Sequence, residues 1–122
     1  MTQAPALDFL SLQVRDRAAS ADFYERLVGL TALPAPNPVV SLFTTGGLTF
    51  AVRDLLPGTD LESGQPGVGI ALWFHSDDTL RLHDRLATAG VEIAEAPTDG
   101  KFGMQFTFVD PDGYRMTVHS AA

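Results

Sequence analysis

Histidine is the side chain of this sequence best suited to proton transfer or metal binding. His75 alternates with Trp73 along one apolar stretch, and His119 alternates with Thr117 along another. If these stretches are neighbouring strands, both imidazoles lie on the same face of one sheet. Two histidines could begin a metal site, but no third ligand accompanies them, so polar groups at the rim of a cleft are the favoured interpretation. The other candidate ligands are His83, Glu92 and Glu95.

Trp73 is the single tryptophan, and its place on a mixed strand face allows two interpretations. It could stack against a planar ligand, or it could fill the core or a dimer interface. An apolar lining with few polar groups is typical of small-molecule pockets. Phe102, Met104 or Phe106 could extend that lining, although we expect two of the three Phe residues in 102–108 to belong to a core strand. The candidate binding residues are Phe9, Gln13, Trp73, His75, Arg115, Thr117 and His119.

Other chemistries have little support in the sequence. It contains no cysteine, which excludes disulfides, thiolate nucleophiles, zinc fingers and iron–sulfur clusters. Ser11, Ser41 and Ser76 have no His–Asp partners at a spacing recognisable for a hydrolase triad. Asp110 and Asp112 resemble a catalytic carboxylate pair, but the segment Asp-Pro-Asp-Gly explains both as turn residues.

The charge balance bears on possible partners. Eight Lys and Arg against fifteen Asp and Glu give a net charge of −7, which repels nucleic acid and favours cationic partners. The apolar stretch Ile70–Phe74 is far shorter than the roughly 20 residues that span a bilayer. The N-terminus lacks a basic region followed by an apolar core. We therefore expect a cytoplasmic protein that binds neither nucleic acid nor membranes.

The residue pattern predicts the same order of elements twice. The elements of the first half are a strand at 8–14, a helix from Asp16 to about Val28, a loop at 33–38, and hairpin strands at 39–45 and 48–53 around Gly46-Gly47. The elements of the second half are a strand at 68–76, a helix at 79–89, a short strand at 91–93, and hairpin strands at 103–109 and 114–119. The second helix places His83 on its exposed side, near Asp84. We expect one domain over 1–122, with module one at about 7–53, a connector at 54–67 and module two at about 68–120.

Several segments resemble the vicinal oxygen chelate superfamily, which contains glyoxalase I, the bleomycin-resistance proteins and the extradiol dioxygenases. Val14–Asp16, Ala18–Tyr24 and Leu27–Leu30 resemble its opening, Asp77–Val91 its second helix, and Phe108–Met116 its closing hairpin. The resemblance implies an α+β fold of paired βαβββ modules that form a curved, mostly antiparallel sheet around a cleft. It also implies a homodimer.

In metal-using members of that family, the ligands are a His or Gln early on a module's first strand and a Glu on its last strand. The matching positions here are Phe9 in the first module, and Ala71 (or Ile70, depending on register) and Thr117 in the second. The end of the first module, Leu48–Arg53, contains no carboxylate or His. These residues cannot replace His and carboxylate ligands, so we expect no metal and no cofactor.

Three functions remain open. The leading hypothesis is a metal-free binding protein of the bleomycin-resistance type, which captures a small cationic or aromatic molecule in a dimer cleft. The alternative is a lyase, isomerase or dioxygenase of the same superfamily, with relocated metal ligands or with His75 or His119 as a general base. A third interpretation is a structural or regulatory module whose cleft is filled by Phe9 and Trp73.

Overall fold

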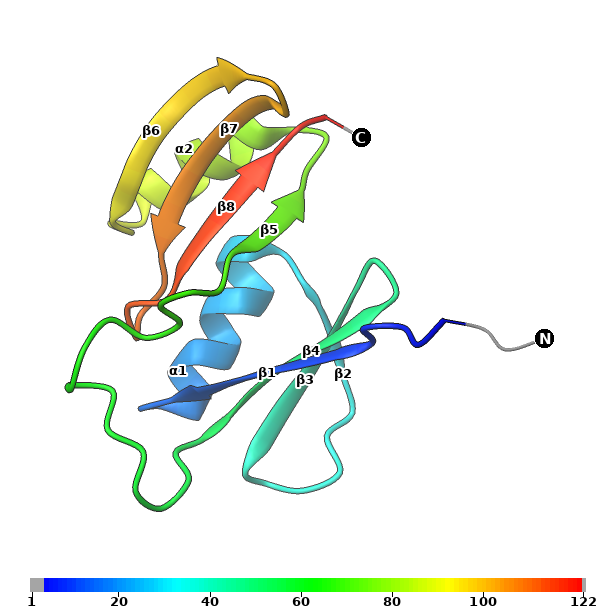
Figure 1. Cartoon of the computed structure of the whole chain (residues 1–122), viewed down its shortest axis with the longest axis vertical. Helices are drawn as coiled ribbons and strands as arrows, with labels where there is room; N and C mark the ends of the chain where they lie inside the picture. The colour runs from blue at the N-terminus through cyan, green and yellow to red at the C-terminus, as the bar shows by residue number, and fades with distance from the viewer. Residues whose placement is uncertain (1–3, 122) are drawn as a thin grey trace. The chain divides into compact units, whose positions relative to one another are not determined.

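The computed structural model describes residues 4–121, which belong to two compact units, Met1–Thr59 and Asp60–Ala122. The boundary falls inside the connector predicted at 54–67. Each unit holds one four-stranded mixed sheet and one helical segment, in the order strand, helix, three strands (Figure 1). The α+β class and the paired βαβββ modules are therefore confirmed, with one sheet in each module.

In the first unit, the strand order across the sheet is β1-β4-β3-β2. β1 runs parallel to β4, while β4 with β3 and β3 with β2 are antiparallel. The elements in chain order are β1 (Phe9–Val14), α1 (Arg17–Asp22), η1 (Phe23–Val28), β2 (Thr31–Leu33), β3 (Val40–Thr45) and β4 (Leu48–Asp54).

The core of the first unit lies between the helical segment and one face of the sheet. Alternation along β1 buries Leu12 and Val14 and leaves Phe9 exposed, as the sequence predicts. Tyr24 is fully buried, with its ring centroid 4.9 Å from that of Phe50 on β4. Among the described residues of this unit, no helix packs on the opposite face of the sheet.

The first helix begins and ends as predicted, but its second half is wound differently. The Asp16 carboxylate accepts a hydrogen bond of 3.0 Å from the amide of Ala19, and Gly29 ends the helix in the left-handed conformation at φ 95°. Between them, η1 is wound as a π-helix rather than an α-helix. A π-helix bonds residue i to i+5, and this half of the helix buries Phe23, Tyr24 and Val28.

In the second unit, the strand order is β5-β8-β7-β6, again with one parallel and two antiparallel pairs. The helix packs against β7 and β6, on the far side of the sheet in Figure 1. Leu86, Phe108 and Met116 are fully buried between the helix and the sheet. The elements in chain order are β5 (Leu72–His75), α2 (Thr79–Thr88), β6 (Ile93–Gly100), β7 (Gly103–Val109) and β8 (Arg115–His119).

Two strands of the second unit differ from their predicted lengths. The predicted strand at 68–76 is reduced to β5, because the amide of Ile70 bonds to the carbonyl of Gly67 at 3.0 Å and closes a turn. The predicted strand at 91–93 is instead the eight-residue β6, an edge strand that contains Pro97 and two register shifts. Edge strands tolerate proline and bulges. Both interrupt the alternation of residues by which a strand is recognised in the sequence. Within residues 4–121, no helix is long and apolar enough to cross a membrane.

Candidate functional site

The second sheet presents one open face, opposite α2. Strand alternation places Trp73 and His75 of β5 on this face, beside Thr117 and His119 of β8. Trp73 pairs with Thr117 and His75 pairs with His119, so the four side chains form two adjacent cross-strand pairs. The prediction that both histidines share one sheet face is thereby confirmed.

Aromatic rings gather at the β5 side of this face. The ring centroid of Trp73 lies 5.3 Å from that of Phe102 and 5.6 Å from that of His119. The rings of His75 and His119 are also 5.6 Å apart. Trp73 is 45% exposed and Phe102 is 52% exposed, so two large rings offer surface to solvent side by side. Exposed aromatic surface of this kind is typical of a binding site.

A row of polar side chains crosses the same face from Trp73 to the opposite edge. Thr117 of β8 hydrogen-bonds to Thr107 of β7, with 2.8 Å between the hydroxyl oxygens. The Thr107 hydroxyl donates to the carboxylate of Glu95 on β6 at 3.3 Å. The cross-strand register aligns Trp73, Thr117, Thr107 and Glu95, so the row has an aromatic end and a carboxylate end.

This row forms one wall of a hollow of about 350 Å³. The segment 65–72 forms another, and the exposed Arg115 lines it as well. Volumes of this order suit small organic molecules. The hollow therefore combines one aromatic anchor, two hydroxyls, one carboxylate and one guanidinium.

The histidines are not arranged as in a catalytic triad. Nε2 of His75 lies 3.2 Å from the carbonyl of Ser120 and 3.7 Å from the carboxylate of Asp77. Nδ1 of His119 is buried and has no hydrogen-bond partner among residues 4–121. Neither imidazole is held by a carboxylate at hydrogen-bond distance in the way a catalytic triad holds its histidine.

The remaining predicted site residues, Phe9 and Gln13, lie in the first unit. They line a hollow of about 430 Å³ on the open face of the first sheet, together with Ser11 and Arg53. Phe9 is 50% exposed, while the Gln13 side-chain oxygen accepts a hydrogen bond of 2.8 Å from the amide of Leu56. Gln13 therefore fixes the segment that follows β4 by a hydrogen bond. The half-exposed ring of Phe9 provides apolar surface in this hollow.

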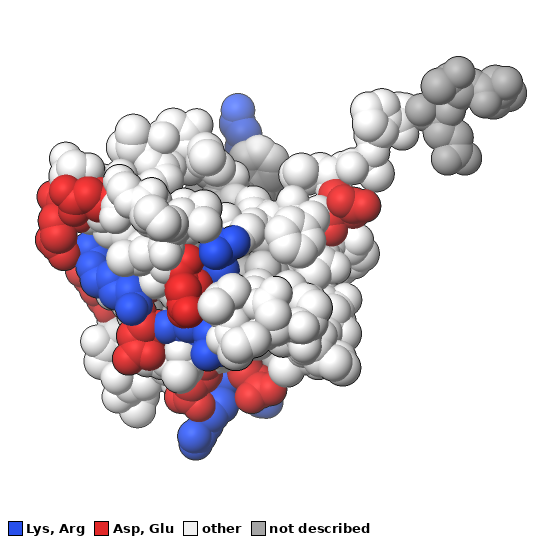
Figure 2. All heavy atoms as spheres, turned by 90° about the horizontal axis from the view of Figure 1, so that it is seen from below, with Lys and Arg blue, Asp and Glu red and all other residues white. Residues whose placement is uncertain are grey.

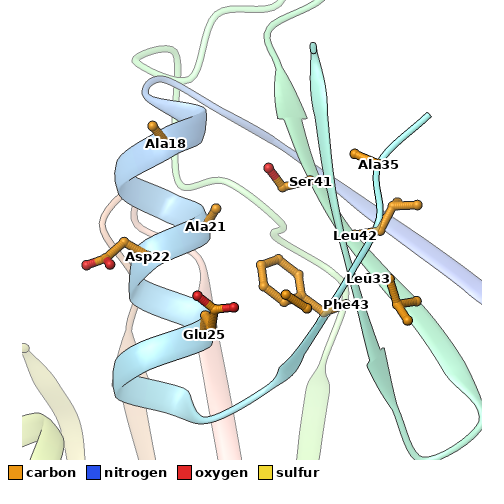
Figure 3. Close-up of a pocket in the computed structure, with 10 residues that line it drawn as sticks. Ala18, Ala21, Asp22, Glu25, Leu33, Ala35, Ser41, Leu42 and Phe43 are labelled. Carbon is orange, nitrogen blue, oxygen red and sulfur yellow. The ribbon is translucent and has the colours of Figure 1, made fainter. Parts of the chain in front are cut away.

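A third hollow, of about 330 Å³, lies beside the first helix and strands β2 and β3 (Figure 3). Alanine methyl groups of the helix line one side, and Leu33 and Phe43 line the other (Figure 3). The two carboxylates at its edge belong to Asp22, which is 3.5 Å from Arg26, and to Glu25. This hollow lacks an exposed aromatic ring and converging hydrogen-bonding groups, so the second sheet offers the better-built site.

The family-type metal site does not fit the residues present. Phe9 and Thr117 occupy two of the positions expected to carry ligands, and the Thr117 hydroxyl is engaged by Thr107. A divalent site needs several His or carboxylate groups that converge on one point. Residues 4–121 hold no group of three or more His, Cys, Asp or Glu side chains that could bind a metal ion.

Two sequence expectations need correction. Phe106 does not extend the pocket lining, because it is buried beneath the sheet with its ring 5.2 Å from that of His83. His83 is correspondingly half-buried rather than solvated, although its Nδ1 does lie 3.0 Å from the Asp84 carboxylate as expected. Phe106 and Phe108 are core residues and Phe102 is exposed, as the prediction of two core Phe residues requires.

Thr107 is the site residue that sequence reasoning missed. Its signal was the alternation of Gln105 and Thr107 with apolar neighbours along 103–109, a pattern that marks a half-buried strand. Glu95 was considered only as a metal ligand.

Charged side chains do not form a patch of one sign on the face shown in Figure 2, where carboxylates and basic groups are interspersed. The net charge of −7 is therefore spread over several elements rather than focused there.

Known proteins resemble this chain along most of its length. Residues 6–118 match the family described as the Glyoxalase/Bleomycin resistance protein/Dioxygenase superfamily. The chain is 35% identical over 130 residues to the anthracycline biosynthesis protein DnrV of Streptomyces peucetius. This alignment covers 94% of this chain and 46% of DnrV. The chain thus spans about half the length of that relative.

Solved structures share the fold. TnmS3, described as an antibiotic binding protein from Streptomyces sp. CB03234, has a TM-score of 0.78 and 24% identity, with 100% of both chains covered. A glyoxalase/bleomycin resistance protein from the same strain has a TM-score of 0.74 and 25% identity, with 94% of this chain and 100% of that chain covered.

Proposed function

The chain belongs to the glyoxalase/bleomycin resistance protein/dioxygenase superfamily, and from this premise we propose that it is a binding protein for a planar aromatic small molecule. The ligand occupies the hollow on the open face of the second sheet and stacks on Trp73. The single observation that carries this proposal is the exposed pair of Trp73 and Phe102 at the end of a polar row.

The solvent-exposed surface of these rings is a source of binding free energy. Trp73 is 45% exposed, and covering apolar surface gains roughly 25 cal/mol per Å² removed from water. A planar ring over the indole gains this term and a stacking term together. A site made for binding needs no catalytic group, which agrees with two histidines that lack carboxylate partners at hydrogen-bond distance.

The relatives favour the same class of ligand. DnrV is named as an anthracycline biosynthesis protein, and the fold is shared with a protein described as antibiotic binding. Anthracyclines contain a planar anthraquinone, which has the shape that stacking on an indole requires. We propose that the ligand is a fused-ring aromatic compound of this kind.

We further propose that the site works without a metal and that two copies of the chain complete the cleft. The first proposal is supported by the side chains at the expected ligand positions, Phe9 and Thr117. The second is supported by the resemblance and by the exposed Val68 and Ile70, which line the hollow and are 77% and 68% exposed. A second copy would cover this apolar surface.

The test uses the single tryptophan as a probe. Titration with 2-hydroxyanthraquinone should quench the Trp73 fluorescence saturably, and calorimetry should give the same dissociation constant. Trp73→Ala should weaken binding by roughly ten-fold, equivalent to about 1.4 kcal/mol. The matched control is Leu80→Ala, which removes a 47% exposed side chain on α2, outside the hollow. Equal binding by wild type and Trp73→Ala would refute the stacking site.

A second candidate, general-base catalysis, is favoured by one observation. Nδ1 of His119 is buried and has no hydrogen-bond partner among the described residues, so none of these residues competes for that nitrogen. His119→Gln would then abolish conversion of a bound ligand, while calorimetry would still detect binding of that ligand. Stoichiometric recovery of unchanged ligand from the wild type would eliminate this candidate for that ligand.

A further inference from the structure

The polar row determines which ligand group the hollow accepts. We propose that Thr117 acts only as a hydrogen-bond acceptor toward the ligand, so that the site selects aromatic compounds whose ring edge carries a hydroxyl or N–H donor. This inference rests on the proposed function, because it concerns the ligand that stacks on Trp73.

The direction of the hydrogen bonds in the row follows from the number of protons available. An ionised carboxylate can only accept, so the single proton of the Thr107 hydroxyl is donated to Glu95 across 3.3 Å. The Thr107 oxygen must then accept from its other hydroxyl neighbour, Thr117, at 2.8 Å. The only proton of the Thr117 hydroxyl is thereby used within the row.

Burial fixes this arrangement. Thr107 is only 7% exposed, so its hydroxyl cannot turn to water and give up its two partners without loss. Thr117 is half-buried and lines the hollow, so its hydroxyl oxygen, whose two lone pairs are not used within the row, can accept a hydrogen bond there. Glu95 on β6 thus determines, through Thr107, that the Thr117 hydroxyl on β8 accepts hydrogen bonds from the ligand rather than donating them.

The strand register places the Thr117 hydroxyl beside a ring stacked on Trp73. Thr117 is the cross-strand partner of Trp73 on a parallel neighbour, and adjacent strands lie about 4.8 Å apart. A ring that covers the indole therefore brings its substituents over Thr117. A hydroxyl or amine donor there completes the row, whereas an ether oxygen would oppose one acceptor with another and leave both without a proton.

The experiment compares 2-hydroxyanthraquinone with 2-methoxyanthraquinone, which share the ring and differ in the donor. It is run at mildly acidic pH to keep the hydroxyl protonated, with calorimetry as the readout. Wild type should bind the hydroxyl compound about five-fold more tightly than the methyl ether, the size expected for one net hydrogen bond. Thr117→Val should remove this preference and still bind both compounds.

Thr107→Val is the sharper variant, because it keeps the shape of the side chain and removes the acceptor of the Thr117 proton. Thr117 should then donate to the methyl ether, so the preference should fall although the residue in contact with the ligand is unchanged. The matched control is Thr88→Val, which deletes a hydroxyl at the exposed end of α2. Circular dichroism checks that each variant is folded.

The outcomes separate the two proposals. If wild type binds both anthraquinones equally and Trp73→Ala binds both about ten-fold more weakly, the stacking site stands and the acceptor inference is overturned. If wild type binds neither compound, the proposed function itself fails for this ligand class, and the inference fails with it. A preference that survives in Thr107→Val also overturns the inference, because the row would then not control the Thr117 proton.

Discussion

At the residue scale, one buried carboxylate organises the turn that joins β7 to β8. Oδ1 of Asp110 accepts hydrogen bonds of 2.9 Å from the amides of Asp112 and Tyr114, and Asp110 is only 4% exposed. These contacts give the Asp-Pro-Asp-Gly segment the turn role that its sequence indicates rather than a catalytic one. The strand that follows carries Arg115 and Thr117 into the hollow.

Replacement of this carboxylate should therefore cost stability. Asp110→Ala leaves two amides of a buried turn without their acceptor, so we expect the free energy of unfolding to fall by about 2 kcal/mol. Urea denaturation measures the change, and Asp99→Ala, at an exposed position of β6, is the control that should stay within about 0.5 kcal/mol of wild type. An equal effect of both substitutions would contradict the special role of Asp110.

Individual residues also show where reading the sequence succeeded and where it stopped. Alternation placed Trp73, His75 and His119 on one face correctly, because the side-chain period of a strand is fixed. Thr107 was not predicted as a site residue, and Glu95 was considered only as a metal ligand. Their contact depends on the pairing of β6 with β7, which contains two register shifts. Pairing across a bulge is set by tertiary structure and leaves no periodic signal.

At the element scale, the hairpin of β3 and β4 depends on two glycines. Gly46 and Gly47 have φ values of 52° and 87°, the left-handed conformation that a two-residue turn of this type requires. The turn was predictable from the sequence because only glycine adopts this pair of conformations readily. The π-wound end of the first helix was not predictable, since its apolar residues fit ordinary helical spacing as well.

The hairpin turn gives a test with an internal control. Gly47→Ala should lower the free energy of unfolding by about 1 kcal/mol, because alanine is strained at positive φ. Gly64→Ala is the matched control: Gly64 does not have positive φ, and nothing lies within 4 Å of the added methyl group. That control should be neutral or slightly stabilising by thermal denaturation. Destabilisation by Gly64→Ala equal to that by Gly47→Ala would show that the conformational argument is wrong.

At the scale of the whole molecule, the chain carries a negative net charge, whereas the charged side chains that line the hollow balance each other. The hollow is lined by one guanidinium, Arg115, and one carboxylate, Glu95, so their charges offset each other. The chain as a whole carries −7, spread over many side chains (Figure 2). Any preference for a cationic ligand should therefore arise from the long-range electrostatic field of the protein. Salt screens this field, because the Debye length is only about 8 Å at physiological ionic strength.

Salt should therefore change the association rate of a cationic ligand more than that of a neutral one. An anthraquinone that carries a trimethylammonium group should associate about three-fold faster than the neutral 2-hydroxyanthraquinone at low ionic strength, and the two rates should converge as NaCl is added. Stopped-flow quenching of Trp73 fluorescence measures both rates. An advantage of the cation that persists at high salt would instead locate the preference in a short-range contact with Glu95, and Glu95→Gln would then abolish it. Loss of the advantage with salt, in wild type and Glu95→Gln alike, assigns it to the charge of the whole molecule.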